Sequence, residues 1–329
     1  MSDLIDLSAL DELAGAVTAA IAVVPVGART QWEVGGPPPT GTTVTAPAGV
    51  VRYEPADMTV TVGAGTSYRE LDAVLAEHGQ ECALDPVDAN ATIGGILATG
   101  LSGRRRLRHG PVRDHLLEVR VVDADGRVVK GGGPTVKNVT GYDLPRLFVG
   151  SFGTLGVLGH VTLRCRPRPA TARWFRVADG AHPGFRPSAV LSDGTTTSVL
   201  LEGAAADVTV QAAGMQECDP PGHIDGEHRG RISVAPGRVD AVGAALARER
   251  GVRWLAELGV GTVHVACDES AGLAAARAVA HAHDGWLLRE AGGGDIDGYG
   301  RPLPNLALMR RIKSAFDPTG KLAPGRLPL

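Results

Sequence analysis

Between residues 84 and 156 the chain carries three clusters of small residues: T-I-G-G-I-L-A-T-G (92–100), V-K-N-V-T-G-Y-D-L (136–144) and G-S-F-G-T-L-G-V (150–157). Glycine lacks a Cβ and tolerates positive φ. Glycines beside threonine and serine therefore let backbone amides converge on an anion or on the edge of a flat ring. Several such clusters along one stretch favour a binding site over a plain surface loop. We expect a large, flat, anionic ligand here.

The size and composition of the chain indicate a globular protein. Its 329 residues exceed the usual size of one domain, so two domains of unequal length are expected. Hydrophobic residues make up 43% and charged residues 21%, which argues against a disordered or fibrous chain. The formal net charge of -3 gives no general attraction to nucleic acid, and no nucleic-acid partner is expected.

A basic run, R-R-R-L-R-H (104–109), directly follows the first cluster. Such runs usually form a solvated face, and we interpret this one in that way. Its position leaves contact with a cofactor phosphate or an acidic partner as the alternative.

The cysteines and the amino terminus bear on redox chemistry and location. The terminus, M-S-D-L-I-D-L, is acidic where a secretory signal is basic, and the apolar run 13–26 is too short and too interrupted by proline to span a bilayer. We expect a cytoplasmic protein with no direct membrane insertion, so that any membrane association is made through partners. Four cysteines without a C-x-x-C motif cannot build an iron–sulfur cluster or a zinc knuckle by themselves: Cys82, Cys165, Cys218 and Cys267.

Apolar spacing and turn residues predict the secondary structure of the first half of the chain. The helix after residue 66 begins with a capping box, in which Ser67 stands three residues before Glu70. The expected elements are a helix over 8–22, strands over 23–26 and 58–62, a helix over 67–79, a hairpin over 117–130 that turns at Asp125-Gly126, and a strand over 156–165.

The second half has weaker patterns. The expected elements are strands over 198–201, 207–211 and 262–266, helices over 239–248 and 270–283, and an amphipathic helix over 305–316 with Leu308, Met309, Ile312 and Phe316 on one face. This mixture suggests a small α+β domain. Because proline removes ladder donors and favours extended connections, we place the main domain boundary at P-R-P (167–169).

The segment V-G-A-G-T-S-Y (62–68) stands between a strand and a helix, as a Rossmann fingerprint does. The third glycine of G-x-G-x-x-G would fall at position 68, which is Tyr68. We therefore predict a tight structural turn here and not a Rossmann site.

The order of the motifs resembles a known family. G-A-R-T (27–30), D-P (85–86), T-I-G-G (92–95), G-P-V-R-D (110–114), the clusters at 136 and 150, and F-D-P-T-G-K-L-A-P-G-R (316–326) are similar to the vanillyl-alcohol-oxidase-type flavoproteins. Within these, the chain resembles the FAD-binding subunits of glycolate oxidases. The resemblance implies an α+β fold with a two-subdomain FAD-binding domain (1–167), a small α+β cap or substrate domain (168–300), and a helix and tail (301–329) that return to the FAD domain.

The resemblance also assigns the cofactor site. It implies non-covalent FAD, with His109 as an ordinary aromatic position and not a covalent anchor. Amides and hydroxyls can offset the diphosphate charge without a metal. The implied cofactor-binding residues are Val26, Gly27, Ala28, Arg29, Thr30, Gln31, Pro86, Thr92, Ile93, Gly94, Gly95, Thr99, Gly100, Ser102, Gly103, Gly110, Val112, Asp114, Lys137, Gly141, Asp143, Gly153, Thr154, Leu155, Gly156 and Val157.

Related hydroxyacid dehydrogenases carry a His-rich metal site in the second domain, and this chain departs from it. His264 is kept, whereas the later E-H-G of the relatives is Glu290, Ala291 and Gly292. One imidazole and one carboxylate fall short of a three- or four-ligand site, so no metal is expected and His264 is interpreted as a hydrogen-bonded core residue. His223 and His228 flank an acidic loop and are interpreted as exposed.

The resemblance implies an FAD-dependent oxidoreductase that acts on the CH–OH group of a small 2-hydroxyacid. We hypothesise a subunit of a glycolate-oxidase-type dehydrogenase complex, which passes electrons to a separate iron–sulfur subunit beside a paralogous larger FAD subunit. In this hypothesis the paralogue carries out most substrate oxidation. The alternatives are a self-sufficient FAD oxidase or dehydrogenase of an alcohol, sugar or lactone, and a non-catalytic scaffold. No catalytic residue is assigned.

Overall fold

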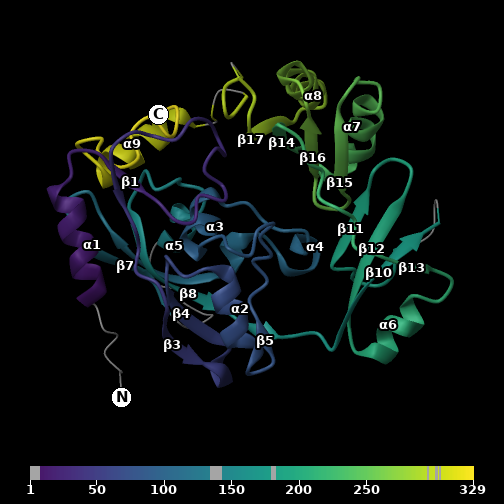
Figure 1. Ribbon diagram of the computed structural model, residues 1–329, viewed down its shortest axis with the longest axis horizontal. Helices are drawn as coiled ribbons and strands as arrows, with labels where there is room; N and C mark the ends of the chain where they lie inside the picture. The colour runs from purple at the N-terminus through teal and green to yellow at the C-terminus, as the bar shows by residue number, and fades with distance from the viewer. Residues whose placement is uncertain (1–7, 134–142, 179–182, 295, 301–302, 304) are drawn as a thin grey trace.

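Two antiparallel sheets organise the computed structural model, which describes residues 8–133, 143–178, 183–294, 296–300, 303 and 305–329 (Figure 1). The first sheet has five strands in the order β3-β4-β8-β6-β7 and contains residues 50–164. The second has eight strands in the order β13-β10-β12-β11-β15-β16-β14-β17 and contains residues 171–291. The observed fold is the α+β type that the sequence predicts.

The five-stranded sheet is the core of the first half of the chain. Its buried face packs against short helices, and Ile93, Ile96 and Leu97 of the first small-residue cluster are fully buried there. The elements of this half are α1 (Ser8–Ala19), β1 (Val23–Pro25), β2 (Thr42–Val44), β3 (Val50–Glu54), η1 (Pro55–Asp57), β4 (Thr59–Gly63), α2 (Tyr68–Ala76), β5 (Gln80–Glu81), α3 (Ile93–Thr99), α4 (Arg106–His109), η2 (Val112–Asp114), β6 (Leu116–Val122), β7 (Val128–Gly132), α5 (Leu144–Phe148), β8 (Val157–Arg164) and β9 (Arg166–Pro167).

Three of the described helices pack against the eight-stranded sheet. Helices α7 and α8 cover β14 to β17, and α6 packs beside β10 and β12 (Figure 1). The elements are β10 (Thr171–Val177), β11 (Ala189–Ser192), β12 (Thr197–Gly203), α6 (Ala205–Gln211), β13 (Gln216–Cys218), β14 (His228–Ser233), η3 (Pro236–Arg238), α7 (Val239–Leu246), β15 (Arg253–Glu257), β16 (Thr262–Cys267), α8 (Ser270–Ala282) and β17 (Trp286–Ala291).

The end of the chain returns to the first sheet. Helix α9 (Leu306–Phe316) places Ile312 and Phe316 against the core of that sheet, and the Phe316 ring meets Phe148 edge-on with 5.7 Å between centroids. The tail then runs beside β1, where Ala323 N donates to Val23 O at 2.8 Å. None of the described helices has the length and apolar composition needed to cross a bilayer.

Most local predictions are confirmed. The capping box of Ser67 and Glu70 starts α2, and the predicted hairpin is the β6–β7 pair. The predicted strand over 207–211 is wrong, because this segment belongs to α6: Val208 is buried, Val210 is exposed, and Thr209 Oγ1 donates to Ala205 O four residues earlier at 2.8 Å. Helix α9 also differs from its prediction, since Leu308 is exposed.

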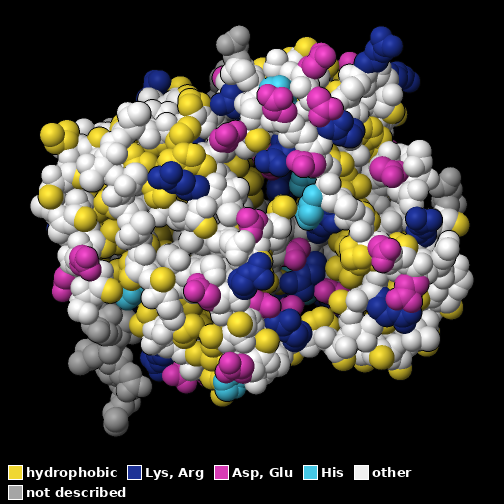
Figure 2. Space-filling model, viewed as in Figure 1, with side chains coloured by type: hydrophobic (Ala, Val, Ile, Leu, Met, Phe, Trp, Pro, Cys, Tyr) yellow, Lys and Arg dark blue, Asp and Glu magenta, His cyan; other side chains and the backbone are white. Residues whose placement is uncertain are grey.

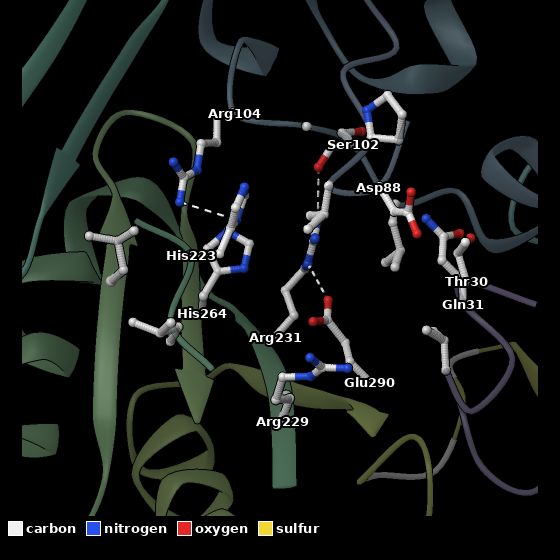
Figure 3. A pocket seen from close by; sticks show the side chains of 18 of the residues that line it. Thr30, Gln31, Asp88, Ser102, Arg104, His223, Arg229, Arg231, His264 and Glu290 are labelled. Carbon is white, nitrogen blue, oxygen red and sulfur yellow. Dashed lines mark hydrogen bonds and ion pairs between the residues drawn. The ribbon is translucent and has the colours of Figure 1, made fainter. Parts of the chain in front are cut away.

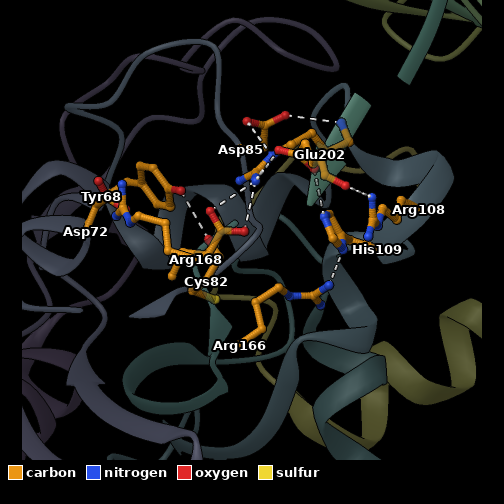
Figure 4. A network of polar contacts seen from close by, with 11 residues as sticks. Tyr68, Asp72, Cys82, Asp85, Arg108, His109, Arg166, Arg168 and Glu202 are labelled. Carbon is orange, nitrogen blue, oxygen red and sulfur yellow. Dashed lines mark hydrogen bonds and ion pairs between the residues drawn. The ribbon is translucent and has the colours of Figure 1, made fainter. Parts of the chain in front are cut away.

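The prediction that the basic run is a solvated face is wrong. Arg105 is buried between the two sheets, where its guanidinium lies 2.9 Å from Glu81, 3.4 Å from Asp85 and 3.2 Å from Glu202 of β12. His109 Nε2 lies 3.4 Å from the same Glu202 carboxylate (Figure 4). The run is therefore a polar connection between the first half of the chain and the second sheet.

Glu202 is the carboxylate of this network that belongs to the second sheet. Burial by itself would raise its pKa, but the hydrogen bond from His109 and the charge of Arg105 hold the pKa of Glu202 at about 2, below its ordinary 4.5. The folded protein thus stabilises the ionised form. This contribution to stability is complete above pH 4.5 and is lost as the pH falls toward 2.

Glu202→Gln should lower the free energy of unfolding by about 3 kcal/mol near neutral pH, because it leaves the buried cations incompletely paired. The difference from the wild type should shrink as the pH falls below 4.5, where the wild type loses the same charge. Denaturant titrations across this range measure both effects. Glu217→Gln is the control, since its pair with Arg173 is exposed to solvent and should contribute little to stability. A difference that stays constant with pH would contradict the assignment.

Candidate cofactor and substrate site

A close backbone contact positions the loop that follows β1. Gly27 lies so near to Thr92 that a Cβ on Gly27 would stand 2.1 Å from the Thr92 hydroxyl. That hydroxyl also caps α3, accepting a hydrogen bond from Gly95 N at 3.2 Å. On the other side Gly153, at a φ of 74°, would place a Cβ 2.9 Å from Pro25. Glycine is therefore required where the three segments meet.

Two adjoining cavities, of about 90 Å³ and about 80 Å³, follow this junction. One continues along the loop toward Arg29 and Arg326, and the other runs over Gly65 and Leu158 on the first sheet. No carboxylate lines either cavity within the described residues. Together they form a cradle whose shared lining is Pro25, Gly27, Thr92, Gly95, Ala98 and Gly153.

Arg326 of the carboxyl-terminal tail holds this loop in shape. Its buried guanidinium donates to four backbone carbonyls, those of Trp32, Val34, Gly36 and Pro37, at 2.7 to 3.1 Å. The tail is thus part of the cradle wall. The predicted return of residues 301–329 to the first domain remains our proposal, and this contact supports it.

A third cavity of about 540 Å³ opens beyond Thr30 and Gln31, which also line the cradle. It lies between the loop 85–104 and the strands β14, β15, β16 and β17. Figure 2 shows basic and histidine side chains gathered in the hollow between the two halves of the molecule. Its charged lining residues are Arg104, Arg229, Arg231, His223, His264, Asp85, Asp88, Asp225 and Glu290 (Figure 3).

Arg231 is the best-anchored cation of this cavity. Its Nε lies 2.8 Å from Glu290 Oε1, and its Nη1 donates to Ser102 O at 2.9 Å (Figure 3). Burial would raise the pKa of Glu290, but the charge of Arg231 holds the pKa below its ordinary value. The ion pair lies within the second sheet, and the hydrogen bond to Ser102 O joins that sheet to the segment after α3.

Arg104 and Arg229 carry charge that is less completely compensated. Arg104 donates to Gly222 O at 2.8 Å and to His223 Nδ1 at 3.2 Å, and it forms no ion pair with any carboxylate in the described part of the chain. Arg229 has one ion-pair partner among the described residues, Asp225, which is largely exposed and 3.2 Å away. A small anion that enters the cavity would meet these two cations.

The structure brings a large part of the predicted set together. Residues that line the three cavities are Val26, Gly27, Ala28, Arg29, Thr30, Gln31, Pro86, Thr92, Gly94, Gly95, Thr99, Ser102, Gly103, Gly153, Gly156 and Val157. Their contact with a cofactor remains a prediction, because the cavities establish only that they face a common space.

Other predicted residues lie elsewhere. Ile93, Val112 and Leu155 are in the core, Thr154 is buried and donates to Ser151 O, and Gly100 ends α3 with a φ of 68°. Gly110 packs against Asp114, and Asp114 and Asp143 pair with Arg146. Lys137 and Gly141 lie outside the described residues. His109 faces the polar network and lines none of the three cavities.

Sequence reasoning missed the polar face of the large cavity. His223 is exposed, as expected, and it also lines the cavity beside Arg104. Arg229 and Arg231 alternate on β14, and Arg231 pairs across the sheet with His264 of β16. The alternation in H-R-G-R-I-S (228–233) was the available signal. Among the described residues, no group of three or more His, Cys, Asp or Glu side chains is arranged to hold a metal ion.

Comparisons with known proteins agree with this architecture. The solved structure of alkyldihydroxyacetonephosphate synthase matches 95% of this chain and 74% of its own, with a TM-score of 0.65 and 14% sequence identity, which concerns the fold alone. Residues 9–132 match the family model described as FAD binding domain. The chain therefore has the fold of that synthase and contains an FAD-binding domain, whose cofactor is FAD.

Two curated relatives resemble the first half of the chain. Glycolate oxidase subunit GlcE of Escherichia coli is 40% identical over 145 residues, which is 43% of this chain and 41% of that protein. D-lactate dehydrogenase of Archaeoglobus fulgidus is 42% identical over 106 residues, 32% of this chain and 24% of that protein. The chain thus matches less than half the length of either relative.

The cradle fits FAD on its own chemistry. Its walls combine glycine backbone, hydroxyls and two arginines, and the absence of carboxylates among its described lining residues suits a diphosphate. Apolar Val44, Ala46 and Leu158 can face a flat ring. The large cavity next to it then stands where a substrate can approach the bound cofactor.

Gly27→Ala should weaken FAD binding at least about tenfold, because the added methyl group collides with the Thr92 side chain and displaces the α3 cap. The measurement is the dissociation constant from flavin fluorescence, with circular dichroism to confirm folding. Gly15→Ala in α1 is the control: its Cβ meets nothing within 4 Å, and FAD affinity should be unchanged. Equal affinity of G27A and wild type would contradict the cradle assignment.

Proposed function

We propose that this chain is the FAD-binding subunit of a 2-hydroxyacid dehydrogenase of the glycolate-oxidase type, an FAD-dependent oxidoreductase that acts on CH–OH donors. The observation that carries the proposal is the cavity of about 540 Å³ that adjoins the FAD cradle. It is lined by three arginines, two histidines and four carboxylates, and Arg104 has no ion-pair partner among the described residues. Its size suits a small molecule, and its cations suit a carboxylate. The names of the two curated relatives support the same substrate class.

The three arginines of the large cavity have different roles in binding. Arg231 is already neutralised by Glu290, so its role is to hold the wall in place. Arg229 and Arg104 can offer charge to a substrate carboxylate, and Gln31 and Ser102 add polar groups at the FAD side of the cavity. Bound FAD supplies the acceptor for the hydride that leaves the hydroxyl-bearing carbon. These side chains furnish a binding site in this chain, which favours oxidation here over oxidation only in a paralogous subunit.

Electrons must then leave this chain toward a partner. The four cysteines are free thiols, and three of them, Cys82, Cys165 and Cys267, are buried. None belongs to a cluster-binding motif, so we propose a separate iron–sulfur subunit as the acceptor, beside a larger paralogous FAD subunit. The word subunit in the name of the Escherichia coli relative supports an assembly of this kind. We further propose that the complex is cytoplasmic.

Anaerobic mixing of the FAD-loaded chain with glycolate or D-lactate should bleach the flavin absorbance, whereas glycerol should not. Arg229→Gln should raise the hydroxyacid concentration for half-maximal bleaching about tenfold or more, because an amide cannot replace a charged hydrogen bond. Arg173→Gln, on the same sheet but outside the cavity, is the matched control. Absence of bleaching would refute the activity, and sustained turnover with oxygen and no partner would refute the subunit assignment.

A further inference from the structure

A buried carboxylate and a cavity-lining imidazole meet on adjacent strands of the second sheet. Glu257 ends β15 and His264 lies on β16, and 2.7 Å separates Glu257 Oε1 from His264 Nε2. The Glu257 side chain is 3% exposed, whereas the imidazole is 18% exposed and lines the large cavity. The carboxylate of this pair therefore lies within the sheet, and its imidazole ring lines the large cavity.

The hydrogen bond to Glu257 determines which ring nitrogen of His264 is left to act as a base. An ionised carboxylate only accepts hydrogen bonds, so neutral His264 carries its proton on Nε2. Its Nδ1 then holds the lone pair, and no residue in the described part of the chain is hydrogen-bonded to that atom. A carboxylate that fixes the tautomer and stabilises the protonated ring is the arrangement that general-base histidines require.

The neighbouring charges permit this role. Arg104, Arg231 and Glu290 line the same cavity as His264, and the charge of Glu257 also acts on Arg104 and Arg106. The Arg231 charge is compensated by Glu290 at 2.8 Å. The second imidazole, His223, differs, because burial and the nearby Arg104 charge lower its pKa. His264 is thus the cavity imidazole with a dedicated carboxylate.

We propose that His264 is the catalytic base of this chain and that Glu257 is its positioning residue. The inference rests on the proposed function. The substrate O–H bond breaks and its proton passes to His264 Nδ1, while the C–H bond breaks and its hydride, with both electrons, passes to FAD. A C=O bond forms, and the imidazolium later gives its proton to solvent. Glu257 holds the ring in the required tautomer and offsets the charge that the ring acquires.

Anaerobic reduction of the FAD-loaded chain tests the proposal. Both His264→Asn and Glu257→Gln should lower the limiting rate of flavin bleaching by about 100-fold while the flavin spectrum and hydroxyacid affinity change little. His281→Asn, exposed at the end of α8, is the control and should match the wild type.

Nitrogen NMR of histidine-labelled protein gives a readout that is independent of turnover. The signal absent from H264N should report a proton on Nε2, and E257Q should mix the two tautomers. A proton on Nδ1, or wild-type bleaching rates in both variants, would overturn the pair. Loss of bleaching with a chelator and its rescue by a divalent metal would also overturn it, in favour of a ligand role. If no hydroxyacid bleaches the wild type, the proposed function fails and the base role fails with it.

Discussion

The junction between the two sheets depends on buried charge pairs, and the rest of the site depends on that junction. Arg105 joins Glu81 and Asp85 of the first half to Glu202 of the second sheet, and Arg231 joins the second sheet to Ser102. Charge pairs in a buried setting are directional and lose much free energy when one partner is removed. They therefore set the distance between the sheets, which defines the large cavity.

The cradle is shaped by the close approach of backbone segments and not by charge pairs. Gly27 and Gly153 bring the first loop and the third cluster against Thr92 and Pro25, with no room for a Cβ. Arg326 then supplies donors to the carbonyls that this loop cannot pair within itself. The cradle thus offers backbone amides and arginines to a ligand, whereas the large cavity offers acidic, basic and histidine side chains.

Local signals were enough to predict the elements that local chemistry determines. The capping box at Ser67, the turn at Asp125-Gly126 and the FAD-type glycine clusters depend on residues a few positions apart. The basic run failed because its solvation is decided by Glu81 and Glu202, which lie 24 and 97 residues away from Arg105. The strand predicted over 207–211 failed because alternating valines also suit a short helix that buries only one of them.

The face formed by His264, Arg231 and Glu290 shows how a histidine that resembles a metal ligand in the sequence can have a different chemical role in the structure. Alone in the sequence, His264 looked like the remainder of a metal site. In the structure it stands opposite Arg231 on the neighbouring strand, in a cavity that also holds Arg104 and Arg229. Arg104 and Arg229 can attract a carboxylate, in a cavity that also holds Asp85, Asp88, Asp225 and Glu290. In our proposal these two arginines neutralise the substrate carboxylate, and the imidazole of His264, oriented by Glu257, takes the proton.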